Sequence, residues 1–355
     1  MTTFFIFACM DDKTIASDTG KISSIPSDTE PPSDTGIEDS DIPDDTALED
    51  SGNNVEPEPP SIVRFVALGD GGEGNQTQYD VADAMKSVCE AKSDSDQTGC
   101  EFALYLGDNI YDVGVDSVTD PQFEEKFELP YQNIDFPFYV VLGNHDYGGW
   151  GSGFEFHKSE YQIDYSYYSN KWTMPSEYYD IHIGHLSLFA LDTNALMWDP
   201  WFNTGAGQDS WLDAAIASSS SEWKIAFGHH PYISNGQHGN AGSYEGIDFI
   251  DWAIAEVPLG TAVEEFMSNH LCGSVDIYFS GHDHNRQFLE PRCGTEFIVS
   301  GTAAKTTDLQ NRGNPSFFED DQKAGFMWVE LRDNCFTGEF YDSTGQLDFT
   351  HHFCK

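Results

Sequence analysis

The chain has 355 residues and a formal net charge of −45, a length that suits one large domain with extensions or two domains. The acidity argues against a nucleic-acid-binding surface, because a duplex carries dense negative charge and needs basic partners. An anionic ligand would bind only where something locally positive, such as a metal ion, overrides this field.

The chain opens with a short apolar run, MTTFFIFAC, that ends in Ala8-Cys9. This run resembles the end of a bacterial lipoprotein signal, in which the cysteine becomes the lipidated N-terminus. The resemblance predicts export to the periplasm, cell surface or exterior, with a possible lipid anchor at Cys9. A mis-assigned start or a chance apolar opening is the alternative. No later stretch has the ~18–20 apolar residues that span a bilayer.

Residues 10–60 contain little besides Ser, Asp, Thr, Pro, Glu and Gly, with a ragged SDT repeat at Ser17, Ser27 and Ser33. Such a segment cannot bury enough apolar surface to offset its chain entropy. We therefore predict a disordered linker whose like charges repel. Calcium binding is the alternative, although no loop here has the ordered D-x-D-x-D-G spacing with a distal Glu.

From residue 61 to 355 the composition is that of a folded domain, and six short apolar runs predict buried strands. The runs are 62–68, 101–106, 136–142, 186–191, 223–227 and 275–279. Helix-compatible stretches lie at 79–91, 208–218 and 262–270, and further strands are expected within 326–353. The alternation predicts an α/β layered domain, whose functional groups gather beyond the carboxyl ends of the strands.

Six cysteines remain when Cys9 is set aside, and no C-x-x-C pair suggests zinc. An even set is compatible with three disulfides in an oxidising compartment. Six cysteines allow 15 connectivities. Proximity along the chain favours Cys89–Cys100, Cys272–Cys293 and Cys335–Cys354.

Nearly every predicted strand is followed by a residue of metal-ligand or catalytic type. These residues are Asp70, Asp108, Asn144, His145, His229, His282 and His284. A lone histidine after a strand is usually structural, but seven such groups at one edge predict a metal site. Carboxylates and imidazoles together suit Zn, Fe or Mn. The set is large enough for two ions about 3.5–4 Å apart, bridged by one carboxylate.

The blocks GD, GDN, GNHD, GHH and GHDH occur in this order between Phe65 and His284. They resemble the five blocks of the calcineurin-like metallophosphoesterases, which implies a four-layer αββα sandwich of two mixed sheets flanked by helices. GDNIYDVGV, at 107–115, is similar to the matching segment of the small, tartrate-resistant purple acid phosphatases. In that family, a tyrosine three residues after the bridging aspartate binds ferric iron. The segments GHHPYISNGQHG and GHDHNRQFLEPRCGTEFIVSGTAAK are similar to that family as well.

The resemblance implies a binuclear metal centre. Ferric iron would be held by Asp70, Asp108, Tyr111 and His284, and a divalent ion (Fe2+, Zn2+ or Mn2+) by Asp108, Asn144, His229 and His282. Asp108 would bridge the ions, and His145 and His238 would act from the outer sphere on the phosphoryl oxygens or the leaving group. A tryptophan often follows the first aspartate in this family, and here Gly71-Gly72 stands instead. His230 is expected to face elsewhere, and Asp192 to make a structural hydrogen bond.

The implied function is an acid phosphatase that hydrolyses phosphate monoesters through a metal-bound hydroxide. Three anionic protein ligands and a bridging hydroxide carry about −4 against about +5 from a ferric–divalent pair, so the site stays slightly positive. The alternatives are a phosphodiesterase or nucleotide hydrolase of the same superfamily and, outside enzymes, a surface-anchored acidic binding lipoprotein. We expect small phosphorylated substrates, no nucleic acid, a monomer, and membrane contact only through Cys9.

Overall fold

The computed structural model describes residues 60–245 and 260–355. The predicted lipid anchor at Cys9 and nearly all of the predicted acidic linker lie outside these residues, so both stay predictions, as does the domain boundary near residue 60. Within the described residues, no helix is long and apolar enough to cross a membrane.

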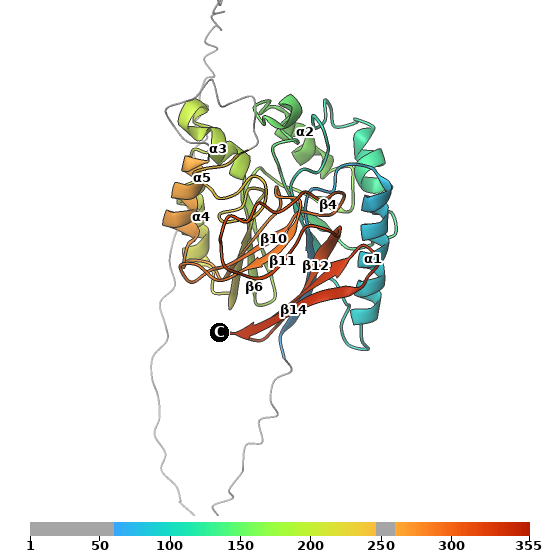
Figure 1. Ribbon diagram of the computed structural model, residues 1–355. Helices are drawn as coiled ribbons and strands as arrows, with labels where there is room; N and C mark the ends of the chain where they lie inside the picture. The colour runs from blue at the N-terminus through green and yellow to red at the C-terminus, as the bar shows by residue number, and fades with distance from the viewer. Residues whose placement is uncertain (1–59, 246–259) are drawn as a thin grey trace, which may run out of the picture. The chain divides into compact units, whose positions relative to one another are not determined.

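Two mixed sheets of seven strands each form the centre of the folded domain (Figure 1). The first sheet has the order β14 (Leu347–Cys354), β13 (Cys335–Asp342), β12 (Gly325–Arg332), β1 (Ile62–Leu68), β2 (Phe102–Leu106), β3 (Phe138–Val141) and β4 (Trp172–Thr173). The second has the order β11 (Ser316–Asp320), β9 (Arg286–Leu289), β10 (Glu296–Ser300), β8 (Ile277–Ser280), β7 (Trp223–Phe227), β6 (Leu186–Ala190) and β5 (Tyr179–Ile183).

Helices flank the two sheets. Helix α1 (Gln76–Lys92) lies on one side, and α3 (Thr193–Phe202), α4 (Gln208–Ser218) and α5 (Thr261–Phe266) lie on the opposite side (Figure 1). Helix α2 (Lys158–Tyr165) and the short helical turns Glu124–Glu128, Gly149–Gly151 and Met267–Leu271 complete the helical elements of the described residues. This arrangement confirms the four-layer sandwich that the family resemblance implied.

The six predicted strands are present as β1, β2, β3, β6, β7 and β8. β1, β2 and β3 pair in parallel in one sheet, as do β6, β7 and β8 in the other. Every residue of β2, β6 and β8 is buried, which explains their continuous apolar runs. The two sheets meet at their strand ends, where the Gly69 N–H after β1 donates to the Ser300 carbonyl of β10 at 2.8 Å.

Helix α3 was not predicted, because its sequence, TNALMWDPWF, is apolar around most of its surface and contains Pro200. Its start is fixed by Asp192, whose Oδ1 accepts a hydrogen bond from the Ala195 N–H at 2.8 Å. This contact is a regular N-cap. The Tyr147 hydroxyl donates to the other oxygen of Asp192. The structural role expected for Asp192 is therefore confirmed.

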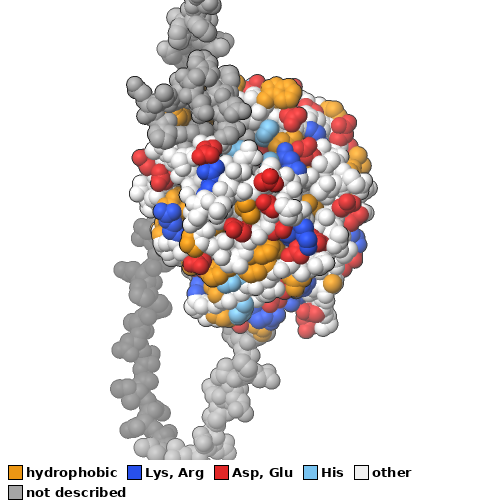
Figure 2. Space-filling view, viewed as in Figure 1, with side chains coloured by type: hydrophobic (Ala, Val, Ile, Leu, Met, Phe, Trp, Pro, Cys, Tyr) orange, Lys and Arg blue, Asp and Glu red, His pale blue; other side chains and the backbone are white. Residues whose placement is uncertain are grey.

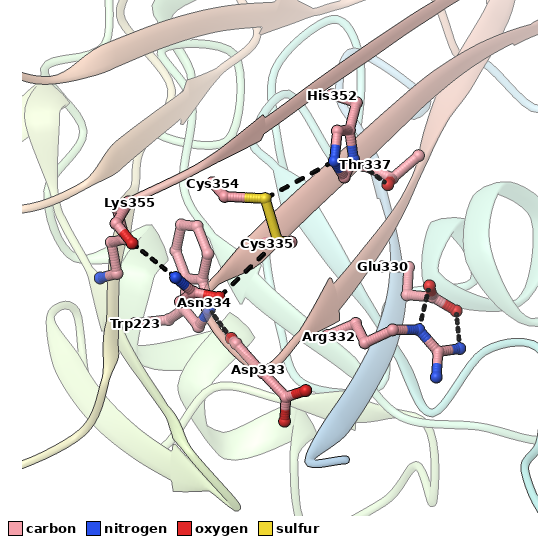
Figure 3. Close-up of a disulfide and its surroundings, with 10 residues drawn as sticks. All are labelled: Trp223, Glu330, Arg332, Asp333, Asn334, Cys335, Thr337, His352, Cys354 and Lys355. Carbon is pink, nitrogen blue, oxygen red and sulfur yellow. Dashed lines mark hydrogen bonds and ion pairs between the residues drawn. A yellow bond between two sulfur atoms is a disulfide. The ribbon is translucent and has the colours of Figure 1, made fainter.

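The three disulfides join Cys89 to Cys100, Cys272 to Cys293 and Cys335 to Cys354, as expected from proximity along the chain. The last one crosses directly between β13 and the edge strand β14 (Figure 3). Cys335, His352 and Cys354 lie close together, and His352 Nε2 is 3.6 Å from the Cys354 sulfur. Because both sulfurs belong to the disulfide, these three residues do not form a metal site. Three disulfides are typical of an oxidising compartment.

The buried Asp192 carboxyl gives a prediction about stability. Burial raises its pKa from the ordinary 3.8 to about 7. The folded state therefore keeps a proton that the unfolded chain releases between these two values, and the contribution of Asp192 to the free energy of unfolding falls as pH rises across that window. Asp192→Asn keeps a cap acceptor but cannot ionise. Its melting temperature should drop less than that of the wild type between pH 4.5 and 7.5, measured by circular dichroism.

Asp209→Asn is the matched control, because Asp209 is an exposed aspartate in the first turn of α4. This variant should keep the wild-type difference between the two pH values. A steeper loss of melting temperature in Asp192→Asn than in the wild type would contradict the prediction.

Candidate metal centre

Three predicted ligands adopt a left-handed backbone conformation directly after a glycine that follows a strand. The φ angles are 60° at Asp70, 51° at Asp108 and 67° at His282. Residues with a β-carbon adopt this region uncommonly, and such backbone strain gathers at functional sites. The same conformation at three strand ends makes this edge of the sheets the candidate functional site.

The glycines of these blocks pack against ligands of other blocks. A β-carbon on Gly281 would lie 2.5 Å from Asp70 Oδ2, and one on Gly143 would lie 2.3 Å from Asp108 Oδ1. These separations are far below van der Waals contact. Each glycine is therefore required by a side chain that another block provides.

The Tyr111 hydroxyl stands at the centre of the first ligand group. Its oxygen lies 2.8 Å from Asp108 Oδ2, 3.1 Å from Asp70 Oδ1 and 3.1 Å from His284 Nε2. His284 Nε2 lies 3.3 Å from Asp70 Oδ1. Tyr111 is fully buried, and its four-residue group combines three oxygen donors with one imidazole.

The second group surrounds His229 Nε2. This nitrogen lies 3.0 Å from Asn144 Oδ1, 3.1 Å from His282 Nδ1 and 3.5 Å from Asp108 Oδ1. His229 Nδ1 lies 2.8 Å from the Leu106 carbonyl, which can only accept, so Nδ1 carries the proton and Nε2 offers its lone pair. Asn144 Nδ2 donates to the Gly151 carbonyl at 2.8 Å and thereby turns Oδ1 toward His229.

Asp108 is common to both groups. Its Oδ2 faces Tyr111, whereas its Oδ1 faces His229 and accepts the His145 backbone N–H at 2.9 Å. The structure thus brings together all seven residues predicted as metal ligands, in two groups that share one carboxylate. This placement is what a bridging ligand requires.

His145 and His238 flank the two groups in matching ways. His145 Nδ1 lies 2.8 Å from the Asp112 carbonyl, and its ring centre lies 4.4 Å from that of Tyr111. His238 Nδ1 lies 2.8 Å from the Glu245 carbonyl, and its ring centre lies 4.1 Å from that of His282. Because a carbonyl only accepts, each Nδ1 carries a proton, and Nε2 is the nitrogen that can exchange one. Both rings are half-buried.

Burial dominates the electrostatics of the ligands. It raises the pKa of Asp70 to about 7 and the pKa of the Tyr111 phenol well above its usual range. It lowers the pKa of His282 well below its usual range and that of His284 to about 4. At Asp108, burial is outweighed by His229, His145 and the His145 N–H, which hold the pKa well below its usual range.

These residues fit two metal ions. Two imidazole nitrogens, His229 Nε2 and His282 Nδ1, face each other across 3.1 Å. Two ligands bound at right angles to one ion, each at about 2.1 Å, lie roughly 3 Å apart. The donor separations in both groups are of that size. A cation between them would relieve the burial of carboxylates and lone pairs.

The family model described as calcineurin-like phosphoesterase matches residues 63–286 of this chain. The chain belongs to that family. It is similar to tartrate-resistant acid phosphatase type 5 of Homo sapiens, at 27% identity over 81% of this chain and 89% of that protein. It is also similar to purple acid phosphatase 4 of Arabidopsis thaliana, at 30% identity over 81% of this chain and 83% of that protein.

Two solved structures share the fold. GAP50, the anchor in the inner membrane complex of Plasmodium, has a TM-score of 0.63 at 22% identity and covers 82% of this chain and 89% of its own. The purple acid phosphatase PPD1 of yellow lupin has a TM-score of 0.58 at 17% identity and covers 83% of this chain and 54% of its own. Membership of the calcineurin-like phosphoesterases makes the protein a phosphoesterase, and therefore a hydrolase.

His230 departs from expectation, because it lies in the histidine cluster and does not face away. Its ring centre is 4.5 Å from that of His282 and 5.0 Å from that of His229. Its Nδ1 lies 2.9 Å from Thr193 Oγ1 at the start of α3. Nothing in the sequence signalled this contact, since α3 itself was not predicted.

Sequence reasoning also missed two buried aspartates that hold the phosphoesterase loops together. Asp146 accepts the N–H groups of Asn109, Ile110 and Gly143 at 2.8–3.1 Å. Asp283 accepts the His238 N–H at 2.7 Å and the Gly239 N–H at 3.3 Å. Both stand inside the GNHD and GHDH blocks. Their presence in these blocks was the only available signal.

Asp283→Asn should loosen the loop that carries His238. The new amide nitrogen would face an N–H donor, so at least one of the two bonds to His238 and Gly239 is lost. We expect amide exchange at these residues to accelerate by on the order of tenfold or more, measured by hydrogen–deuterium exchange. The control is Asp276→Asn, because Asp276 accepts the Lys224 N–H at 2.8 Å at the opposite end of β8. Unchanged exchange at His238 in Asp283→Asn would contradict this role.

Proposed function

We propose that the protein is a binuclear-metal acid phosphatase that hydrolyses phosphate monoesters. The observation that carries the proposal is the enclosure of the Tyr111 hydroxyl by Asp70, Asp108 and His284 at 2.8–3.1 Å. Phenolate is a hard, anionic oxygen donor, and hard donors suit a highly charged cation. Ferric iron is therefore the ion proposed for this group.

The second ion would be divalent (Fe2+, Zn2+ or Mn2+), held by Asn144, His229 and His282 and sharing Asp108 with the iron. When bound, the two ions supply Lewis-acid stabilisation of the phosphoryl oxygens and a water of lowered pKa. The ions also provide the positive charge that a phosphate needs in a domain whose surface carries acidic side chains over the face seen in Figure 2.

The protein's own catalytic groups are Asp108, His145 and His238. Asp108 orients both groups of ligands, because its two oxygens face different sides. The Nδ1–H bonds of His145 and His238 to backbone carbonyls fix their rings. Each Nε2 is then the atom that holds a proton for a phosphoryl oxygen or passes it to the leaving alkoxide.

The enzyme would act outside the reducing cytosol. Three disulfides support this location, and the Ala8-Cys9 pair supports export with a possible lipid anchor. The anchoring described for GAP50 belongs to that protein, and the likeness to it concerns the fold.

The purified protein should contain iron and one divalent ion per chain and should be purple from tyrosinate-to-iron charge transfer. Tyr111→Phe removes the phenol oxygen, so the visible band should disappear even where iron is retained. Metal analysis with a visible spectrum of both proteins tests this expectation. Tyr105→Phe is the control, because Tyr105 is equally buried but is not a ligand. An iron-loaded wild type without colour, or an unchanged spectrum in Tyr111→Phe, would refute the ferric assignment.

A monoester should be the better substrate. A monoester offers three non-bridging oxygens to two ions and two outer histidines, whereas a diester offers two and adds a second ester group that must be accommodated. The rate with p-nitrophenyl phosphate should exceed the rate with bis-p-nitrophenyl phosphate by at least about tenfold, measured in parallel at acid pH. A faster reaction with the diester would instead indicate the phosphodiesterase alternative.

A further inference from the structure

Two lysines contact Tyr111, although basic residues are scarce in this domain. Residues 60–355 contain 46 acidic residues and 14 lysines and arginines. Lys126 Nζ bonds the Tyr111 backbone carbonyl. Lys305 Nζ stands over the Tyr111 ring, 3.3 Å from its centre. A cation at this distance from a ring face makes a close cation–π contact.

Lys305 is held in place by its surroundings. Its Nζ lies 2.7 Å from Glu73 Oε1. Its backbone is fixed on both sides, because Ala303 N–H donates to the Gly69 carbonyl at 3.0 Å and Thr307 N–H donates to the His284 carbonyl at 2.8 Å. The ammonium group is thus a built part of the metal centre and not a freely moving surface charge.

We propose that Lys305 is a positioning residue that tunes Tyr111 as a metal ligand. A positive charge on the ring face stabilises the electron-rich phenolate and lowers the energy of its highest filled orbital. Lys305 thereby makes Tyr111 a weaker electron donor than an isolated tyrosinate. This inference rests on the proposed ferric site, and it concerns the electronics of the ligand and not contact with the substrate.

The visible spectrum of the iron-loaded protein measures this effect directly. The cation lies against the ring that donates the electron, so it raises the energy of ligand-to-iron charge transfer. Removing the charge should move the absorption maximum to longer wavelength. The strength of a cation–π contact corresponds to a shift on the order of 10 nm.

The experiment compares Lys305→Met and Lys305→Gln with Lys305→Arg, which keeps the charge. The two neutral variants should be red-shifted, and the arginine variant should remain near the wild type. Lys323→Met is the matched control, because Lys323 is also an ion-paired lysine, bound to Asp342 and Asp348 at 3.1 and 2.7 Å. Its spectrum should be unchanged. Iron content and circular dichroism are measured for every variant.

An unchanged absorption maximum in the neutral variants would overturn the inference, even if their KM increased, because that pattern belongs to a lysine that binds substrate. Loss of iron from folded neutral variants would also overturn it, since removing a positive charge should favour a trivalent cation. A colourless, iron-loaded wild type refutes the ferric site itself and is therefore distinguishable from both outcomes.

Discussion

The backbone N–H of His282 donates to Asp70 Oδ2 at 2.9 Å, and this hydrogen bond joins the ends of two strands that belong to different sheets. Asp70 follows β1, and His282 follows β8. Together with the bond from Gly69 to Ser300, it fixes the seam along which the sheets meet. Every predicted ligand lies at this seam, so the two ligand groups form only when both sheets are assembled.

The seam concentrates groups that are costly to bury alone. Asp70 and Asp108 are fully buried next to a phenol and three imidazoles. The raised pKa of Asp70 reflects the free-energy cost of burying its charged carboxylate. Bound cations would offset this cost, because paired charges tolerate burial that isolated charges do not. Metal loading and folding stability should therefore be linked in this protein.

The parallel strands could be predicted from the sequence because they are continuous apolar runs. Their ligands could be predicted because they stand in short blocks that begin with glycine. The sequence did not predict α2, α3 or β9–β11. Helix α3 lacks amphipathic periodicity, and β9 (RQFL) and β11 (SFFED) contain polar or charged residues in place of a continuous apolar run. The residues that surround the ligands could not be predicted from the sequence either. His230 and Asp283 owe their roles to contacts between the loops that follow β7 and β8, and Lys305 owes its role to a contact across the seam. Such contacts follow from tertiary packing and not from spacing along the chain.

The glycine of one block packs against the predicted ligand of another block, and this packing has an evolutionary consequence. Gly281 makes room for Asp70, and Gly143 makes room for Asp108. A larger residue at either glycine would therefore displace a predicted ligand that belongs to another block. The blocks therefore cannot drift independently, although long stretches of chain separate them. They should be inherited as a single unit that is either kept whole or lost together.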